Sequence, residues 1–350
     1  MKKVLMVMGG VFLLGFVAVL VMPWSFASHN ISDDDYATWM ADYVHPDRRL
    51  IDVAMPGAHD AFARGMTLQS PLDTVAMTSG YGNALLNPPI GPFIKGFMVR
   101  QSTTQIGDAP SLLQAGVRYF DVRLTYQDGW HVTHNYLAPV NVLDELTAIA
   151  DFLETNAGEV VLLDFQWVFD DRSDNAFADA QTFDDVLTLL DDAGLTRFII
   201  PAADVDLATL TYGEASQEGS SLLLFAKTGL HAAFFDRETH LESTWHNTDS
   251  FAELVDGIAA STNDGETATR FRVMQAVKTV QVDATGMLRA IVSWSLLQRA
   301  TGFHADLIQH EGFETWLATT PIVMTDASDL NVEGFVDDLM EIIIRINTAP

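Results

Sequence analysis

Residues 50–60 read LIDVAMPGAHD, an apolar run that ends in a proline, a glycine and then two polar side chains, His59 and Asp60. Two later runs have the same character: residues 117–123 (VRYFDVR) end on Arg123, and residues 130–135 (WHVTHN) contain His134 near their end. Short apolar runs bounded by Gly or Pro are typical of buried β-strands. The pattern therefore predicts buried strands that carry chemistry-bearing side chains at their ends.

Strand-like and helix-like segments alternate through the rest of the chain. We expect strands at residues 51–56, 117–124, 130–134, 160–167, 221–226, 271–279 and 321–326, and helices at residues 141–156, 183–193, 287–300 and 333–347. This order indicates a parallel sheet, and the almost continuous apolar run at 160–167 fits a sheet covered on both faces. The prediction is an α/β fold, a TIM-type (β/α)8 barrel that is distorted or slightly open. Its sixth strand has no clear sequence pattern.

Six polar side chains fall at or just past the ends of these strands. They are His59, Asp60, Arg123, His134, Gln166 and Asp326. In (β/α)8 barrels the active site lies at the carboxyl ends of the strands. Two imidazoles can divide the work of general base and general acid near neutral pH, and a guanidinium can hold a phosphate between them. These residue types therefore indicate in-line cleavage of a phosphodiester.

The order and spacing of five segments also resemble a known family. The segments are MPGAHD (55–60), GVRYFDVR (116–123), His134 eleven residues later, EVVLLDFQ (159–166) and PIVMTD (321–326). Together they are similar to the X-domain pattern of phosphatidylinositol-specific phospholipase C. The likeness runs from about residue 50 to residue 330 and is sharp only in these segments. WHNTD (245–249) resembles a loop of the family and is expected to form part of the pocket wall.

The resemblance implies a role for each catalytic residue. His59 would be the general base that activates a substrate hydroxyl, with Asp326 orienting its ring. His134 would be the general acid, supported by Asp60, and Arg123 would clamp the phosphate. His131 competes with His134 for the acid role. It lies three residues away, however, and so on the opposite face of a strand, where we expect it to pack.

Three further residues, Asp121, Asp164 and Gln166, are expected to bind substrate. Calcium-dependent members of the family have acidic residues where this chain has Arg123 and Gln166. Only Asp60 and Asp121 remain as ligands, which are few for an ion that takes six to eight oxygens. The resemblance thus implies the metal-independent, bacterial-type branch with no cofactor, and calcium is the weaker alternative. Gln166 departs from that branch, where a cationic residue is usual.

The function that the resemblance implies is cleavage of a phospholipid or a related small phosphodiester. A neighbouring hydroxyl would attack the phosphorus and give a cyclic phosphate plus an alcohol such as diacylglycerol. The alternative is a catalytically weak or inactive barrel that acts as a surface-anchored binding protein. Turnover of any phosphodiester by the purified protein would separate the two.

The composition restricts the partners. The chain has 47 Asp and Glu against 19 Lys and Arg, a net charge of −28. Such a surface repels nucleic acid, and it permits only transient contact with a membrane unless salt screens it. This acidity fits either a salty habitat or a soluble secreted protein. The absence of cysteine excludes disulfides and thiolate nucleophiles. We expect a monomer.

Three regions are expected along the chain. Residues 1–27 are a signal peptide cleaved after Ala27 or an uncleaved anchor through the apolar stretch 4–22. The protein would then be secreted or periplasmic, or held on the outer face of the cytoplasmic membrane. Residues 28–49 are a polar lead-in, and residues 50–350 form the barrel. A loop inserted at about 65–100 would be a lid or membrane wedge over the active face, or would pack against barrel helices.

Overall fold

The computed structural model describes residues 35–348 except for 77–90, 174–176, 218, 228–230, 263–267 and 282–294; of residues 91–94 only the backbone is described. The predicted signal or anchor at 1–27 lies outside the described residues. Among those that are described, the helices are all too short or too polar to cross a membrane.

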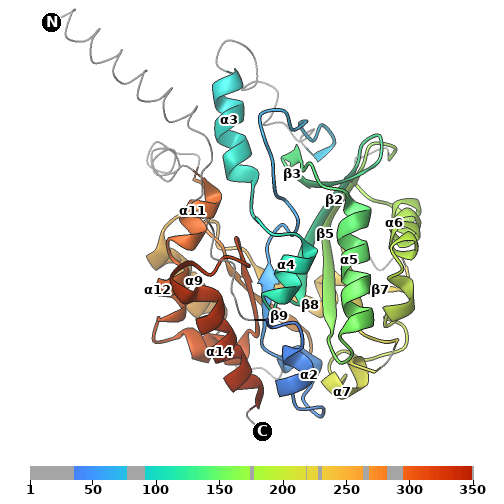
Figure 1. Ribbon diagram of the computed structural model, residues 1–350, viewed down its shortest axis with the longest axis vertical. Helices are drawn as coiled ribbons and strands as arrows, with labels where there is room; N and C mark the ends of the chain where they lie inside the picture. The colour runs from blue at the N-terminus through green and yellow to red at the C-terminus, as the bar shows by residue number, and fades with distance from the viewer. Residues whose placement is uncertain are drawn as a thin grey trace, which may run out of the picture.

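Eight parallel strands form a nearly closed barrel, which confirms the predicted fold (Figure 1). In chain order they are β1 (Met55–Ala58), β2 (Tyr119–Tyr126), β5 (Val161–Asp170), β6 (Leu222–Ala226), β7 (Phe234–Asp236), β8 (Leu241–Thr244), β9 (Phe271–Ala276) and β10 (Ile322–Thr325). Around the barrel the order is β7-β6-β5-β2-β1-β10-β9-β8. The two end strands are joined by the short helix α8 (Arg237–His240) instead of by a ladder of hydrogen bonds, so the barrel has one open seam.

The prediction of residues 130–134 as a barrel strand is wrong. These residues form β3 (Trp130–His134), which pairs antiparallel with β2 and then with β4 (Tyr136–Leu137). Only three residues, 127–129, join β2 to β3. A parallel crossover needs a dozen residues or more, so this connection permits only a hairpin. The hairpin extends beyond the barrel on its carboxyl-terminal side (Figure 1).

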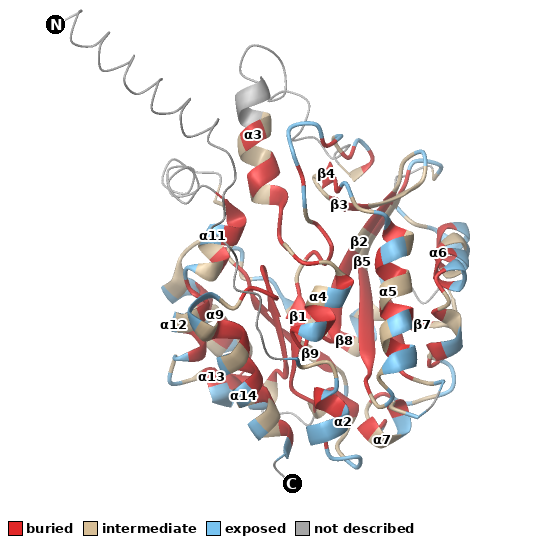
Figure 2. Ribbon diagram, in the orientation of Figure 1, coloured by how far each residue is buried: buried red, intermediate tan, exposed pale blue. Residues whose placement is uncertain are grey.

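Helices cover the outside of the barrel, with their buried faces turned to the strands (Figure 2). They are α2 (Trp39–Tyr43), α3 (Gly91–Ser102), α4 (Ala109–Gln114), α5 (Val142–Thr155), α6 (Ala180–Asp192), α7 (Tyr212–Ala215), α9 (Phe251–Ser261), α11 (Leu296–Thr301), α12 (His304–Ile308), α13 (Phe313–Thr319) and α14 (Phe335–Thr348), with 3-10 turns at Leu50–Asp52, Thr196–Phe198 and Val332–Gly334. Every residue of β1, β6 and β10 is buried. This burial explains why their sequences are apolar without alternation.

The expected insertion at 65–100 is described only at its two ends. Near the first end, Asp73 is buried and its carboxylate accepts a hydrogen bond from the Thr133 hydroxyl at 2.6 Å, so this part packs on the hairpin. The second end is α3, which contacts α11. The described ends therefore pack against the protein, whereas residues 77–90 lie outside the described residues and a lid or wedge there stays a prediction.

A buried ion pair fixes the amino-terminal end of the barrel. The Arg118 side chain donates to Glu159 at 2.7 Å and to four backbone carbonyl groups, and both side chains are fully buried. One of these carbonyls belongs to Tyr36, so the pair also attaches the lead-in to the barrel. Because a buried guanidinium needs this full set of acceptors, Arg118 has a structural role.

We expect Arg118→Met to lower the free energy of unfolding by about 3–5 kcal/mol, because it leaves the Glu159 carboxylate buried without its partner. Urea unfolding followed by circular dichroism measures this. Arg197→Met is the matched control. Arg197 pairs with Glu154 at 2.8 Å with both side chains more than half exposed. Its loss should change stability by less than about 1 kcal/mol. Equal effects of the two substitutions would contradict the structural role of Arg118.

Candidate active site

His59 and Asp326 lie side by side because their strands are neighbours. In the parallel pair β1–β10, Ala58 is in register with Thr325, so the next residue of each chain segment emerges at the same level. His59 Nδ1 lies 2.7 Å from Asp326 Oδ1, and the carboxylate is buried. A carboxylate on Nδ1 fixes the tautomer that presents a lone pair at Nε2.

Gln105, which carries no recognisable pattern in the sequence, holds these two strand ends together. Its side-chain amide donates to the carbonyl groups of His59 at 2.8 Å and Thr325 at 3.1 Å. Its side-chain oxygen accepts from the backbone N–H of Ser328 at 3.0 Å. Gln105 is fully buried, so it acts as a positioning residue for the pair of His59 and Asp326.

Asp60 is turned back into the site by its backbone. Its φ of 43° is in the left-handed region, which is unusual for a residue with a side chain. The buried carboxylate forms an ion pair with Arg123 Nε and lies 3.2 Å from His134 Nδ1. The structure therefore brings Asp60 to the histidine that it was predicted to support.

Arg123 lies at the centre of the site, on β2. Its Nη2 contacts Asp121 at 3.0 Å, Gln166 Oε1 at 2.9 Å and His59 Nε2 at 3.2 Å. Gln166 reaches it through a bulge in β5: the ladder passes from Val122↔Phe165 to Arg123↔Trp167 and leaves Gln166 unpaired. Arg123 Nη1 makes no hydrogen bond to the described residues and is free to bind a ligand in the pocket.

The hairpin delivers His134 to the opposite side of Arg123. The His134 ring lies 6.4 Å from the His59 ring, centroid to centroid, and its Nδ1 also contacts the carbonyl of Ser102 at 3.0 Å. His131 instead contacts the carbonyl of Gln127 at 3.0 Å and does not line the pocket. His134 is therefore the histidine of the pair, as predicted.

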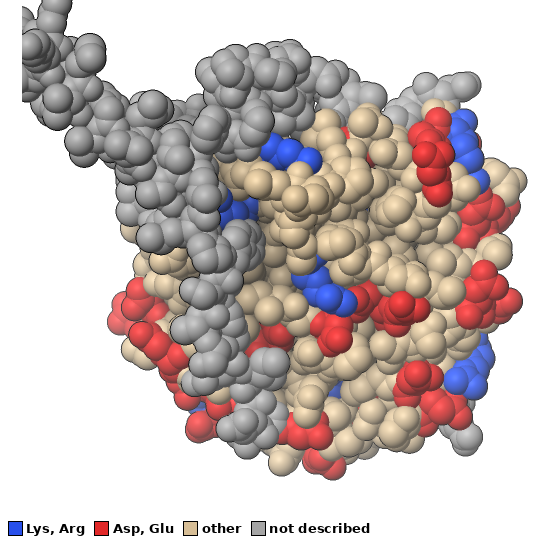
Figure 3. All heavy atoms as spheres, turned by 45° about the horizontal axis from the view of Figure 1, so that its top comes forward, with Lys and Arg blue, Asp and Glu red and all other residues tan. Residues whose placement is uncertain are grey.

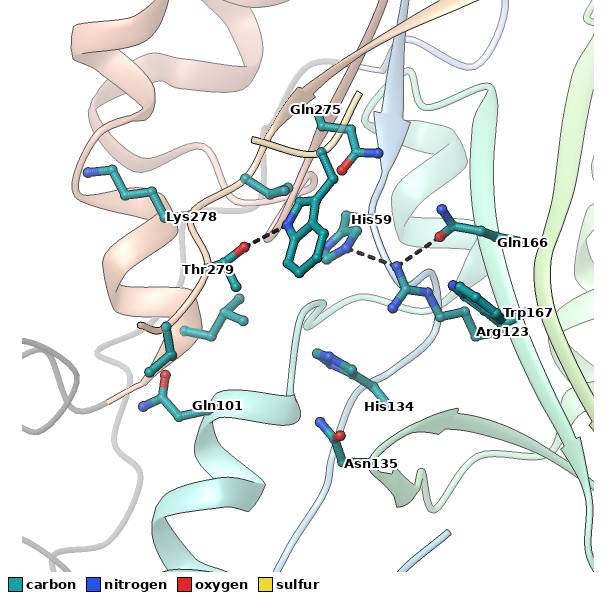
Figure 4. Close-up of a pocket in the computed structure, with 14 residues that line it drawn as sticks. His59, Gln101, Arg123, His134, Asn135, Gln166, Trp167, Gln275, Lys278 and Thr279 are labelled. Atoms are coloured by element: carbon teal, nitrogen blue, oxygen red, sulfur yellow. Dashed lines mark hydrogen bonds between the residues drawn. The ribbon is translucent and has the colours of Figure 1, made fainter. Parts of the chain in front are cut away.

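These groups open into a pocket of about 480 Å³ at the carboxyl-terminal end of the barrel (Figure 4). His59, Arg123, His134 and Gln166 line it, together with Trp245 from the segment predicted to form the wall. In the view toward this end of the barrel, acidic side chains lie mainly toward the sides and the lower edge (Figure 3). The centre of that view is mostly uncharged, so the acidic surface does not continue into the pocket.

Asp164 does not line this pocket, which corrects its prediction as a substrate-binding residue. It is fully buried one step deeper along β5 than Gln166. Its carboxylate accepts from the Tyr119 hydroxyl at 2.6 Å and from Arg237 Nε at 2.9 Å. Burial raises the pKa of Asp164 to about 6, against the opposing effect of Arg237. Asp121 is also buried and contacts Arg123, which leaves its carboxylate engaged within the protein.

The electrostatics differ between the two histidines. Burial alone would lower the pKa of His59, but the carboxylates of Asp60 and Asp326 outweigh it and raise this pKa to about 9. For His134 burial prevails and lowers the pKa. Burial would raise the pKa of Asp60, but Arg123 and the two histidines hold it below its ordinary value. Near pH 7 the ligand-free pair of histidines thus shares one proton, held mainly by His59.

One group of side chains in the described part of the chain could share a metal ion: His59, Asp60 and Asp121. It does not fit calcium, which takes six to eight oxygen ligands. Arg123 contacts both of these carboxylates, so a fixed positive charge already neutralises them.

No protein-family model matches the chain. Among curated proteins it is 26% identical to human PI-PLC X domain-containing protein 2 over 259 residues, which cover 70% of this chain and 78% of the relative. It is 30% identical to zebrafish (Danio rerio) PI-PLC X domain-containing protein 3 over 146 residues, 40% of this chain and 44% of that protein.

Two solved structures are similar in fold. The phosphatidylinositol-specific phospholipase C from Listeria monocytogenes gives a TM-score of 0.58 at 15% identity and covers 89% of this chain and 98% of its own. A mutant of the corresponding enzyme from Staphylococcus aureus gives 0.57 at 13% identity, with 88% and 98% covered. With the curated relatives, these likenesses show that the chain belongs to the PI-PLC X-domain family.

Proposed function

We propose that the protein is a phosphodiesterase of the phospholipase C type that cleaves a phospholipid or a related phosphodiester bearing a hydroxyl next to the phosphate. The observation that carries this proposal is the arrangement around Arg123. Two imidazoles, each with a carboxylate at Nδ1, lie on either side of a guanidinium that keeps one nitrogen free. In the proposal Arg123 Nη1 binds a phosphate oxygen and stabilises the charge that develops there in the transition state.

The reaction would proceed by attack of the neighbouring hydroxyl. His59 Nε2 takes the hydroxyl proton as the oxygen bonds to phosphorus. The bond from phosphorus to the leaving oxygen then breaks, and His134 donates a proton to that oxygen. The products are a five-membered cyclic phosphate and an alcohol such as diacylglycerol, and the exchange of protons leaves the pair of histidines with one proton in total.

The assignment of base and acid follows the contacts at each ring. A guanidinium only donates hydrogen bonds, so the contact of Arg123 Nη2 with His59 Nε2 requires a lone pair on that nitrogen, as a base has. The raised pKa of His59 places the proton on the same ring in the empty site. An anionic phosphate bound beside His134 would favour transfer of this proton to His134, which gives the reactive form.

We expect a bell-shaped dependence of kcat/KM on pH, because the reaction needs one proton on the pair of histidines. The alkaline limb should lie near pH 9, where His59 loses its proton. Asp326→Asn removes a carboxylate that raises the pKa of His59, so this limb should move to lower pH and maximal turnover should fall. Initial rates on a soluble short-chain substrate measure both effects. An alkaline limb that stays in place would contradict the coupling of Asp326 to His59.

The proposed activity itself is tested by phosphorus NMR of purified protein with phosphatidylinositol in detergent micelles. A transient cyclic phosphate is the expected first product. Absence of turnover on phosphodiesters with a neighbouring hydroxyl would favour the binding-protein alternative. We also propose that the protein acts outside the cytoplasm, which rests on the pattern of residues 1–27 alone.

A further inference from the structure

The pocket lining has an unusual composition for so acidic a chain. The 14 lining residues include no aspartate or glutamate, although the chain has 47 of them. Four side-chain amides line it instead, from Gln101, Asn135, Gln166 and Gln275, together with two tryptophans. Figure 4 shows Gln166 and Gln275 around the same space as His59 and Arg123. A ligand in this space therefore meets neutral hydrogen-bonding groups beyond the reaction centre.

Gln275 is held so that one end of its amide remains available. It lies on β9, and its Nε2 donates to Ser243 Oγ on the neighbouring strand β8 at 2.7 Å. The side chain is 5% exposed and borders the pocket. Its Oε1 makes no hydrogen bond with the described residues. A carbonyl oxygen fixed in this way is ready to accept a hydrogen bond from a ligand hydroxyl.

Gln166 presents the complementary group. Its Oε1 accepts from Arg123 Nη2 at 2.9 Å, which directs its Nε2 away from the guanidinium. Within the described part of the structure that nitrogen has no acceptor. The two glutamines therefore offer one acceptor and one pair of donors to the same pocket.

Trp245 adds a flat apolar surface. Its side chain is 56% exposed and lines the pocket, and its indole N–H donates to Thr279 Oγ1 at 2.8 Å. An exposed tryptophan costs free energy, whereas a ring fixed at a pocket wall can pack on the apolar face of a ligand. Thr279 also lines the pocket, so this hydrogen bond joins the two sides of the wall.

The charges of the pocket are engaged elsewhere. Lys278 lines it, but its ammonium lies 4.4 Å from the centre of the Phe303 ring and 5.5 Å from that of Phe251, against the helices. Figure 4 shows its side chain directed away from His59. Arg123 is occupied by the reacting phosphate in the proposed function. The pocket thus offers no further counter-charge for an anionic or a cationic head group.

We propose that Gln275, oriented by Ser243, is the residue that selects the head group, and that with Gln166 and Trp245 it accepts an uncharged group bearing several hydroxyls. This inference rests on the proposed phosphodiesterase function. A site built to hydrogen-bond a hydroxyl rejects an analogue that lacks it, because the buried amide is then left unpaired. A second phosphate on the head group would be rejected because it finds no cation.

The test compares turnover of phosphatidylinositol, phosphatidylglycerol and phosphatidylinositol 4-phosphate, each in the same detergent micelles. The first two carry a hydroxyl next to the phosphate and differ in the number of further hydroxyls. The wild-type protein should prefer phosphatidylinositol over both others. Gln275→Leu should lower the ratio of kcat/KM for phosphatidylinositol to that for phosphatidylglycerol by about tenfold, the cost of one buried unpaired group. Ser243→Ala should lower it less.

Two more variants make the result decisive. Gln275→Glu keeps an acceptor oxygen, so it should retain phosphatidylinositol turnover and discriminate more strongly against the 4-phosphate. Gln181→Leu, on the exposed surface of α6, should leave the ratio unchanged. If Gln275→Leu slows both lipids equally, or the wild type prefers the 4-phosphate, the selectivity proposal fails while the phosphodiesterase function stands. If none of the three lipids is turned over, the proposed function itself fails.

Discussion

Alanine at His59 or at His134 is expected to lower turnover by about 10²–10⁴-fold, the usual contribution of one general acid or base. Each substitution removes one proton-transfer group from the pair that lies 6.4 Å apart across Arg123. Both side chains border the pocket and neither belongs to the hydrophobic core, so the variants should stay folded. Steady-state rates and thermal unfolding, measured on the same preparations, separate the two effects.

His131→Ala is the matched control, because His131 lies on the same hairpin but does not line the pocket. Its turnover should stay within about twofold of wild type, since it takes no part in the proposed proton transfer. Near-normal activity of either pocket variant in a folded protein would overturn the site. An equal loss in all three variants would indicate that the hairpin, not the imidazoles, was disturbed.

A substrate with a leaving group of low pKa separates the roles of the two histidines. Such a group departs without a proton, so a general acid contributes little to its release. With a p-nitrophenyl ester, the loss caused by His134→Ala should shrink, and the loss caused by His59→Ala should persist. The reverse result would make His134 the base and His59 the acid, an order that the ligand-free pKa values of the two rings would also fit.

The sequence segments that end in polar residues predicted the barrel and brought most of the site together. They succeeded because neighbouring parallel strands end at one level, so that His59 and Asp326 meet although 267 positions separate them. The hairpin strand was mistaken for a barrel strand because an apolar run looks alike in parallel and antiparallel pairs. The signal was present: Asp128 and Gly129 both have positive φ and follow β2 directly, as in a hairpin turn.

Other features had no pattern to find. β7 and β8 are three and four residues long, too short for periodicity to reveal. Asp164 and Gln166 both follow apolar residues of one strand, and the sequence does not show which one reaches the pocket. Gln105 comes from a segment without regular structure, and only tertiary contacts reveal that it joins two strand ends.

Arg123 is the second residue whose replacement should have a large effect. Arg123→Lys is expected to lower turnover by about 10²–10³-fold, comparable to the loss of one donor that stabilises transition-state charge. Lysine keeps the positive charge beside Asp60 and Asp121, but a single ammonium cannot reach both carboxylates, Gln166 and a phosphate at once. Thermal unfolding should show that the variant remains folded, and the loss should appear mainly in kcat.

The same guanidinium leads us to expect that activity persists in excess chelator. Arg123 contacts the two carboxylates, Asp60 and Asp121, that a calcium ion would need, and it carries the positive charge that the ion would supply. Turnover should therefore be equal with EDTA and with added calcium. Arg123→Asp examines the converse: it creates a third carboxylate where the cation was, and its low activity should not recover with calcium, because the cage still lacks most of the oxygens that the ion requires. Loss of wild-type turnover on chelation, restored by calcium, would show that a metal and not Arg123 neutralises the reacting phosphate.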